Sequence, residues 1–302
     1  MKNIMIKSAL LIGALGVSLL CAGIPESLIK SSVQDKIQTI PYEDRDILEK
    51  FFRDLLFFHE FAYTLFGDKP VSVEWFDSDN PRRPDIFRTS SQGYRMFEKY
   101  AYLFPSQHYL ILCCEDLEED LCEFTLINKK AFQQTFEAHK KKFAEFFGSE
   151  VSSDELLDLL VKKRSLWKTV MKDRDDLIGI LLGYGKINAE LFQKRSELSN
   201  MTRKITKDRM IPSEGYLSTE QELNDLNTTL QPFSREERIS LRLMRLPGFV
   251  ANSKHEETVQ LKKKYSEQRK RITRCYIQGN ILEIVFEQLC GDVKNRQMEG
   301  VR

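Results

Sequence analysis

Residues 42–66 read YEDRDILEKFFRDLLFFHEFAYTLF, and this stretch decides the fold. Acidic residues near its start suit the positive end of a helix dipole, Pro41 suits a first turn, and Gly67 suits a C-terminal stop. Its apolar residues cover more of the helix surface than one narrow stripe. They are Leu48, Phe51, Phe52, Leu55, Leu56, Phe58, Phe61, Ala62, Leu65 and Phe66. We therefore expect one long helix over 42–66, packed on several sides at the centre of the core.

The segments that follow this helix predict a small sheet. VSVEWF (71–76) alternates apolar and polar residues, as a strand does. HYLILCC (108–114) and CEFTLIN (122–128) are two further strand-like runs, separated by the acidic stretch EDLEEDL, which indicates a hairpin. Between the first strand and the hairpin, Ser90 or Ser91 can cap a helix that ends near Pro105.

From Asn128 onward the pattern is helical. Residues of one helix face recur at spacings of three and four: Phe132, Phe136, His139, Phe143 and Phe147. Four capping boxes predict helix starts, at Ser152 with Glu155, Ser218 with Gln221, Ser234 with Glu237, and Ser253 with Glu256. Residues 199–216 are polar and weakly periodic, which favours a surface excursion or a subdomain seam. We predict a mainly α-helical α+β fold with a single globular domain over 41–302.

The N-terminal segment, residues 1–25, predicts a relation to a membrane. Lys2 and Lys7 precede an uncharged apolar run from Ser8 that ends in small residues, the pattern of a secretory signal or a single membrane anchor. Cys21 is an alternative site of lipid attachment, although Leu20 replaces the usual small residue before it. Residues 26–40 are a polar tether in this interpretation. The positive charge before the run places the body outside the cytoplasmic membrane, anchored or secreted.

The cysteines do not form the framework of a small disulfide-rich domain. The chain has 6 cysteines, and those beyond Cys21 include one adjacent pair. A disulfide from Cys122 to either Cys113 or Cys114 is an open alternative. No CxxC pair and no paired histidines occur, so the sequence predicts no structural zinc site.

Candidate catalytic and cofactor motifs fail at defined positions. His59-Glu60 resembles the start of HExxH, but Tyr63 occupies the place of the second histidine. Gly183-Tyr-Gly185-Lys186 resembles a nucleotide-binding loop, but the further glycines and the hydroxyl residue are absent, which favours one helix ending at these glycines and another beginning. Asp77 and Asp79 are better explained as turn residues than as calcium ligands.

We therefore predict no catalytic, metal or cofactor-binding residue. An unrecognised envelope enzyme of hydrolase type is an alternative, and it would need several titratable groups in one pocket, for instance His108 with Asp85 or Glu98.

The basic stretch KKKYSEQRKRITR (262–274) is a candidate for contact with an anionic membrane surface. The cations that would make this contact are Lys262, Lys263, Lys264, Lys270 and Arg271. The simpler interpretation is the solvated face of an amphipathic helix, with Leu261, Tyr265, Ile272 and Tyr276 on its apolar side. Because we expect an exported protein, nucleic acid is not an expected partner.

Three segments resemble an exported or membrane-associated protein family of chlamydia-related intracellular bacteria. They are FFHEFAYTLFGDKPVSVEWF (57–76), DDLIGILLGYGKINAELF (175–192) and LPGFVANSKHEETVQLKKKY (246–265). The resemblance implies a bacterial envelope setting. The family has no established activity, so no functional residue is carried over. The sequence thus favours an envelope-associated interaction or structural protein without catalytic activity, which contacts the membrane through its N-terminal segment and an unknown protein partner.

Overall fold

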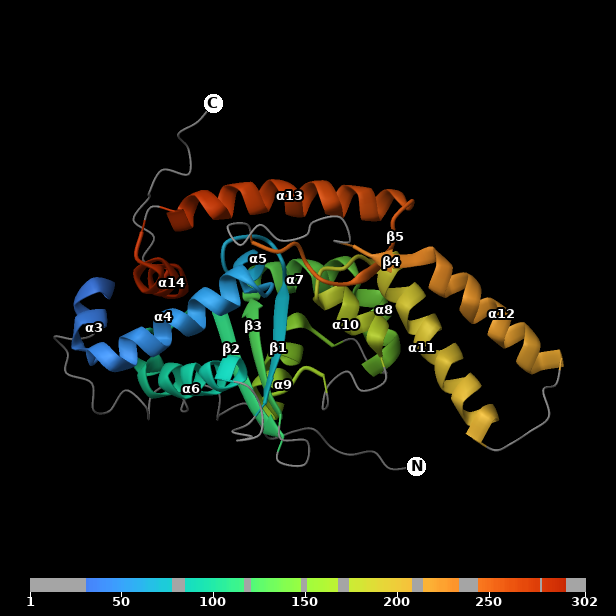
Figure 1. Ribbon diagram of the computed structural model, residues 1–302, viewed down its shortest axis with the longest axis horizontal. Helices are drawn as coiled ribbons and strands as arrows, with labels where there is room; N and C mark the ends of the chain where they lie inside the picture. Colours follow the sequence, from blue (N-terminus) through green and yellow to red (C-terminus); the bar gives the residue numbers. More distant parts are fainter. Residues whose placement is uncertain are drawn as a thin grey trace.

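The computed structural model describes residues 31–77, 85–116, 121–147, 151–167, 174–207, 214–233, 244–277 and 279–291. Helices dominate and surround a small antiparallel sheet, so the predicted mainly helical α+β fold is confirmed (Figure 1). The helices before the second half of the chain are α3 (Val33–Thr39), α4 (Tyr42–Phe57), α5 (Phe61–Leu65), α6 (Asp85–Tyr100), α7 (Lys129–Ala138), α8 (Lys140–Phe147) and α9 (Ser153–Lys163). Those that follow are α10 (Asp175–Leu181), α11 (Lys186–Lys207), α12 (Glu214–Thr229), α13 (Glu256–Ile277) and α14 (Ile281–Cys290). Among the residues described, no helix combines the length and apolar character needed to cross a bilayer.

Three strands form the central sheet in the order β1-β3-β2. They are β1 (Val71–Asp77), β2 (Tyr109–Asp116) and β3 (Leu121–Asn128), and all pairs are antiparallel. Val71 lies opposite Ile127, and Leu112 lies opposite Thr125. Both the VSVEWF strand and the 108–128 hairpin are therefore confirmed.

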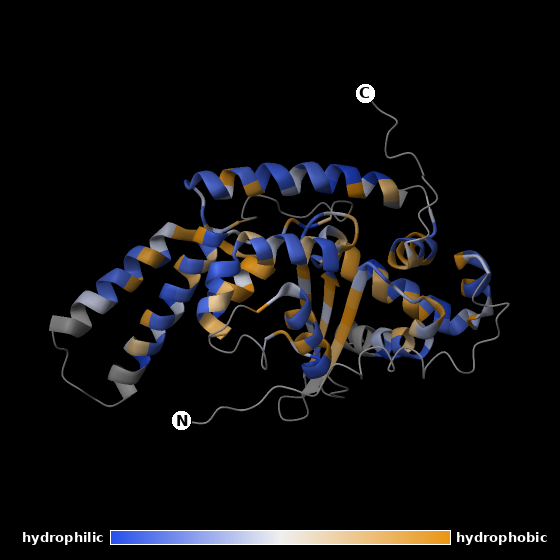
Figure 2. Ribbon diagram, turned by 180° about the vertical axis from the view of Figure 1, so that it is seen from behind, coloured by the Kyte–Doolittle hydropathy of each residue, from blue (hydrophilic) through white to orange (hydrophobic). Residues whose placement is uncertain are grey.

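Apolar residues of its strands contribute to a core on each face of the sheet, and Figure 2 shows hydrophobic colouring along the strands. Side chains alternate between the faces of a strand. Phe124 and Leu126 of β3 join a core formed with α4, α5, α6, α13 and α14. Val71 and Ile127 join a second core formed with α7, α9, α10 and α11. We call these the α4 core and the α10 core.

The Phe-rich stretch lies in the α4 core as predicted, but it is two helices rather than one. Helix α4 ends at Phe57, and α5 begins at Phe61 after a turn. Phe51, which we expected in the core, is 1% exposed, but Phe58 is 39% exposed, and that part of the prediction is wrong. The break occurs because the polar side chains of His59 and Glu60 are held by partners outside the helix, described below.

Helix α6 packs directly across α4. A Cβ added at Gly93 would lie 2.3 Å from the Cβ of Phe51, so only glycine allows this approach. At the other end of the contact the Tyr100 hydroxyl donates to Asp44 at 2.5 Å. Helix α6 begins at Asp85, earlier than the cap expected at Ser90 or Ser91.

Part of the expected polar tether is an ordered helix. Helix α3 begins at a capping box between Ser32 and Asp35, and its residues Val33 and Ile37 are each 4% exposed. They belong to the α4 core, where α3 contacts α14. The prediction for 26–40 was therefore wrong over α3, because two apolar residues one turn apart were enough to dock a short helix. Residues 1–25, with Cys21, lie outside the described residues.

The predicted capping boxes had different outcomes. Ser152 and Glu155 form theirs at the start of α9. Ser218 lies inside α12 rather than before it. Helix α13 does begin near the Ser253 box, but His255 caps it, since its Nδ1 accepts from the Glu257 amide at 3.2 Å. The box at Ser234 lies outside the described residues.

A helical hairpin projects from one end of the molecule. Helices α11 and α12 run side by side away from the sheet, and residues 199–207 of α11 and 214–216 of α12 lie toward their far ends (Figure 1). At the near end of the hairpin, β4 (Leu230–Pro232) pairs with β5 (Val250–Asn252). This short ribbon lies beside the α10–α11 turn and leads into α13.

Candidate functional site

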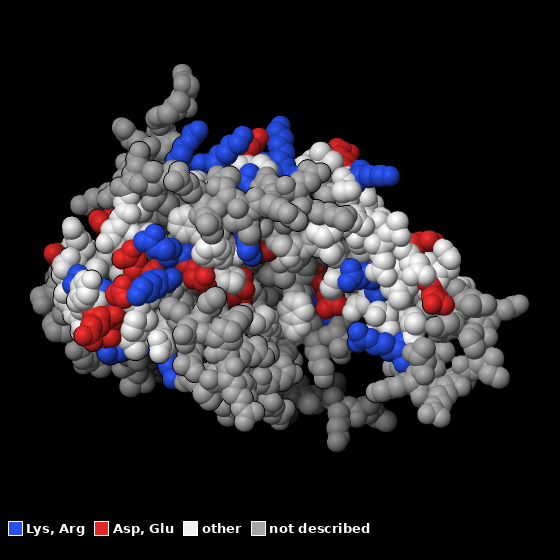
Figure 3. Space-filling model, in the orientation of Figure 1, with Lys and Arg blue, Asp and Glu red and all other residues white. Residues whose placement is uncertain are grey.

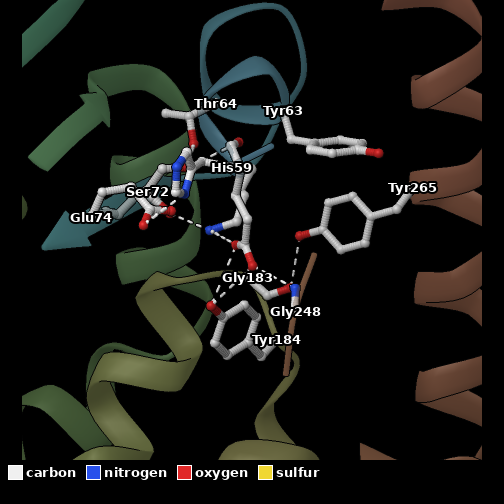
Figure 4. A network of polar contacts seen from close by, with 12 residues as sticks. His59, Tyr63, Thr64, Ser72, Glu74, Gly183, Tyr184, Gly248 and Tyr265 are labelled. Carbon is white, nitrogen blue, oxygen red and sulfur yellow. Dashed lines mark hydrogen bonds and ion pairs between the residues drawn. The ribbon is translucent and has the colours of Figure 1, made fainter. Parts of the chain in front are cut away.

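The carboxylate of Glu60 joins three segments that are far apart in the sequence, and Figure 4 labels its partners Tyr184 and Gly248. Its Oε2 lies 3.0 Å from Nζ of Lys69. Its Oε1 accepts from the Gly248 amide at 2.6 Å. The Tyr184 hydroxyl donates to the same carboxylate at 3.3 and 3.4 Å. The break between α4 and α5 therefore positions the α10–α11 turn and the segment that leads into β5.

Lys69 is the most deeply buried charged residue of this group, with 0% exposure. Its ammonium group also donates to the Val71 carbonyl and lies 5.2 Å from the ring centroid of Tyr184. Burial lowers the pKa of Lys69, and the Glu60 carboxylate only partly opposes this effect. Because the ammonium group is enclosed by these partners, its role is to hold the surrounding segments rather than to meet a substrate.

Tyr184 connects this buried pair to a row of stacked rings. Its ring stacks on Phe249 with centroids 4.3 Å apart, and Phe249 stacks on Phe233 at 4.3 Å. Burial, reinforced by the Glu60 charge, raises the pKa of Tyr184 well above its usual value. The hydroxyl therefore stays protonated and donates to Glu60.

A cavity of about 450 Å³ opens beside these rings. Its volume lies within the range of small-ligand pockets. Aromatic and aliphatic side chains dominate its wall. It is lined by Val73, Trp75, Trp167, Asp175, Ile178, Gly179, Leu182, Tyr184, Asn188, Ala189, Phe192, Pro232, Gly248, Phe249 and Val250. The chain contains 2 tryptophans, and both line this cavity.

A buried carboxylate positions the two tryptophans. Glu123 on β3 is 1% exposed and lies opposite Trp75 on β1. It accepts from the Ser165 hydroxyl at 2.5 Å and from the Leu166 amide at 2.8 Å. Trp167 follows directly, and it is 37% exposed. Glu123 thus fixes the segment after α9 so that Trp167 lies near the strand that carries Trp75.

The α10–α11 turn forms another wall and explains the glycines that resemble a nucleotide loop. Gly183 and Gly185 have φ angles of 72° and 89°, which favour glycine. The amides of Lys186 and Ile187 at the start of α11 donate to the Glu257 carboxylate at 2.8 and 3.0 Å. This carboxylate occupies the helix N-terminus where a phosphate would bind. The sequence interpretation of a helix end followed by a helix start is confirmed.

The buried side-chain amide of Asn188, on the cavity wall, forms hydrogen bonds to neighbouring elements of the fold. Asn188 donates to the Tyr184 carbonyl and to Thr258 Oγ1, both at 3.0 Å. Its Oδ1 accepts from the Asn252 amide at 3.0 Å. This side chain therefore ties α11 to β5 and α13, and the remaining wall is mainly apolar.

The comparisons with known proteins find no significant match. This holds for protein-family models, for curated proteins and for solved structures. The resemblance to exported proteins of chlamydia-related bacteria therefore stays a prediction. The function has to be argued from the geometry of this chain.

His59 lies outside the cavity, on the other side of the turn that contains Glu60. Its Nε2 lies 3.3 Å from Asp54 and its Nδ1 lies 2.9 Å from Glu74. Burial lowers the pKa of His59, but the hydrogen bonds and charges of the two carboxylates outweigh it and raise the pKa to about 9. His59 is thus a cation that links α4 to β1.

The structure does not join His59 and Glu60 into a metal site. Among the described residues, no group of histidine, cysteine and acidic side chains could hold a metal ion. Tyr63, which stands in place of the second HExxH histidine, donates from its hydroxyl to the Arg245 carbonyl at 2.8 Å. Glu98 and Asp85 were named above as titratable groups that an enzyme would need in one pocket. Glu98 lies 3.6 Å from Arg164, and the side chain of Asp85 is outside the described residues.

The basic residues of α13 lie along its outer side, while Tyr265 and Ile272 are buried (Figure 3). Lys262, Lys263, Lys270 and Arg271 are exposed. Lys264 forms an ion pair with Asp68 at 3.1 Å, and Arg271 donates to the Phe66 carbonyl at 3.4 Å. The predicted amphipathic division is present, and Lys264 and Arg271 have partners within the protein.

The residues that line the cavity could not be recognised from the sequence. Trp75, Trp167, Tyr184 and Phe249 come from four segments, and no local spacing relates them. One signal was available: the chain has 2 tryptophans, and Trp75 lies on an alternating strand beside a glutamate. The convergence itself depends on the long-range bonds of Glu60 and Glu123.

Proposed function

We propose that this protein is a non-catalytic interaction protein, and that its cavity accepts an apolar segment of a partner protein. The observation that carries the proposal is the aromatic lining, with Trp75, Trp167, Tyr184 and Phe249 around one space. Aromatic side chains dominate the energetics of protein recognition because they bury a large apolar area at a low cost in side-chain entropy. The wall is mainly apolar, which suits an apolar guest.

An extended segment of a protein fits the surroundings of the cavity better than a compact small molecule. β1 is an edge strand of the central sheet, and its Val73 and Trp75 line the cavity. Pro232 and Val250 of the β4–β5 ribbon form the opposite border. An extended chain can bond to a strand edge through its main chain while one of its side chains enters an adjoining pocket. We therefore expect an apolar side chain to fill the cavity while the flanking residues run along β1.

Tryptophan fluorescence tests this directly, because both tryptophans line the cavity. The probe is a capped peptide of sequence Leu-Thr-Phe-Thr-Leu, and the control peptide carries Ser in place of the central Phe. We expect a saturable change in emission with the first peptide and a much weaker one with the second. Equal responses to both would contradict the proposal. Saturable binding of naphthalene without any peptide binding would also contradict it, since the ligand would then be a small molecule.

A matched pair of variants locates the response. Val250→Phe narrows the cavity and should weaken peptide binding by roughly tenfold or more, since about 1.4 kcal/mol corresponds to tenfold. Val161→Phe makes the same change on α9 at a residue that is 49% exposed and does not line the cavity. It should bind as the wild type does. Unchanged binding by Val250→Phe would place the peptide elsewhere.

The exposed lysines of α13 support a second candidate, contact with an anionic membrane surface. Lys262, Lys263 and Lys270 are exposed on the side away from the buried Tyr265 and Ile272. Binding to vesicles containing phosphatidylserine should then fall steeply with added salt. Replacement of these three lysines by glutamine should abolish it, and unchanged binding would rule this candidate out.

The proposed setting is the bacterial envelope, with the body on the extracytoplasmic side. Its support is the sequence pattern of residues 1–25, where Lys2 and Lys7 precede an uncharged apolar run. Protease added to intact spheroplasts should digest the body. Protection of the body until the cells are lysed would place it in the cytoplasm.

A further inference from the structure

The thiols of two cysteines on the β2–β3 hairpin are in contact with each other. Sγ of Cys113 on β2 lies 2.9 Å from Sγ of Cys122 on β3. In the strand register Cys113 lies opposite Phe124, and Cys122 lies two residues from Phe124 on the same strand. Side chains two residues apart share a face of the sheet. Both thiols therefore point into the α4 core, where Cys113 is 6% and Cys122 is 4% exposed.

The register also distinguishes between the two partners that the sequence left open for Cys122. Cys114 follows Cys113 on β2, so it lies on the opposite face of the sheet. It lies opposite Glu123, whose carboxylate is bound to Ser165 and Leu166. Cys114 thus belongs to the other side of the strand pair, and Cys113 is the partner that the backbone brings to Cys122.

We propose that Cys113 and Cys122 are joined by an intramolecular disulfide that forms while the chain folds. In the structure both are thiols. The oxidant is a protein or small-molecule disulfide. One cysteine thiolate attacks it and releases a thiol, and the second thiolate then attacks the resulting mixed disulfide and releases the other thiol. The two cysteines lose two electrons and two protons, and the oxidant is reduced to two thiols.

Burial determines when this exchange takes place. The contact with Cys122 and burial both raise the pKa of the Cys113 thiol, so little thiolate exists once the hairpin has packed. Phe124 and Tyr94 beside the pair exclude larger reagents. The bond therefore forms before α6 covers this face, and afterwards it resists reduction.

Refolding of the full-length protein tests the proposal without reference to its cellular location. The reduced, denatured chain is refolded in a glutathione buffer in which the reduced form is in excess, then denatured and alkylated, and its peptides are identified by mass spectrometry. We expect Cys113 and Cys122 in one linked pair and Cys114 alkylated. Alkylation of both Cys113 and Cys122, or a link between Cys122 and Cys114, would overturn the proposal.

Variants confirm the pairing and separate it from an effect on folding. Cys114→Ser should keep the link, and Cys113→Val, which preserves an apolar side chain, should lose it. Reduction should lower the melting temperature of the wild type by roughly 5–10 °C, as expected for a short closed loop in a chain of this size, and should leave that of Cys113→Val unchanged. An equal effect of reduction on both proteins would contradict the proposal.

As a further control, folded, reduced protein should stay largely unlinked in the same glutathione buffer. Rapid formation of the disulfide in the folded protein would contradict the proposed order of events.

Discussion

The carboxylate of Glu60 is the residue on which the candidate site depends most. It is the ionic partner of the fully buried Lys69 and also accepts hydrogen bonds from Gly248 and Tyr184. Removing one member of a buried ion pair leaves a charge without compensation, which typically costs about 3–5 kcal/mol. We expect Glu60→Ala to lower the free energy of unfolding by about that amount in urea denaturation.

A double variant and a surface control make this prediction specific. Glu60→Gln with Lys69→Met removes both charges, so it should be more stable than Glu60→Ala although it carries two changes. Glu49→Ala removes an exposed helical pair with Arg53, and it should cost only about 0.5 kcal/mol. If Glu60→Ala were as mild as Glu49→Ala, the Glu60 carboxylate would not hold the three segments together.

His59 makes the stability of the protein depend on pH. Its pKa in the folded protein is about 9, above the usual 6.5, because Asp54 and Glu74 favour the imidazolium. Its contribution is therefore complete below pH 6.5 and is lost as the pH rises through about 9. The imidazole is 30% exposed, so solvent weakens the pair, and we expect a loss of about 1–2 kcal/mol.

The measurement is urea denaturation at pH values near 6 and near 9.5, for the wild type and for His59→Gln. The difference in free energy of unfolding between the two proteins should shrink at the higher pH. A difference that stays constant over this range would show that His59 is not charged between its two carboxylates.

At the scale of elements, the break between α4 and α5 determines which phenylalanine side chains are buried and contribute most to stability. Phe51 is 1% exposed and its ring contacts those of Phe52, Phe76 and Phe124, whereas Phe58 is 39% exposed at the end of α4. We expect Phe51→Ala to cost about 3–5 kcal/mol. Phe58→Asp should cost roughly 1 kcal/mol, since the carboxylate can reach water.

This ranking differs from the expectation from sequence, in which Phe58 packs in the core as Phe51 does. Thermal and urea denaturation of the two variants will rank them. A ranking in which Phe58→Asp is the more damaging change would mean that α4 and α5 form one continuous buried helix.

The sequence predicted those elements whose signals are local. The alternating VSVEWF strand, the hairpin of β2 and β3 and the glycine-containing α10–α11 turn were all identified, because each depends on a few adjacent residues. The break at 58–60 was not identified, since residues 42–66 are continuously suited to a helix. It is stabilised by Glu74 and by Gly248, and Gly248 lies 188 positions beyond Glu60.

At the scale of the whole molecule, the sheet divides two cores and leaves the aromatic cavity at one edge. The α4 core and the α10 core lie on opposite faces, and β1 is the edge strand that borders the cavity. The β4–β5 ribbon closes the other side, held through Asn188. The cavity could not be predicted from sequence, because its residues come together only when the ribbon, the α10–α11 turn and β1 are all in place.

The central claim is that this cavity receives an apolar side chain of a partner protein. Photo-cross-linking tests this claim most directly. The probe is the peptide Leu-Thr-Phe-Thr-Leu with benzoylphenylalanine in place of its central residue. It is irradiated together with the full-length protein, and mass spectrometry then identifies the residue to which it is attached. We predict attachment to cavity residues such as Val73, Trp75, Trp167 or Phe249, and loss of the product with excess unlabelled peptide. Attachment to α13 or to the α11–α12 hairpin, or a product that excess peptide does not reduce, would contradict the claim.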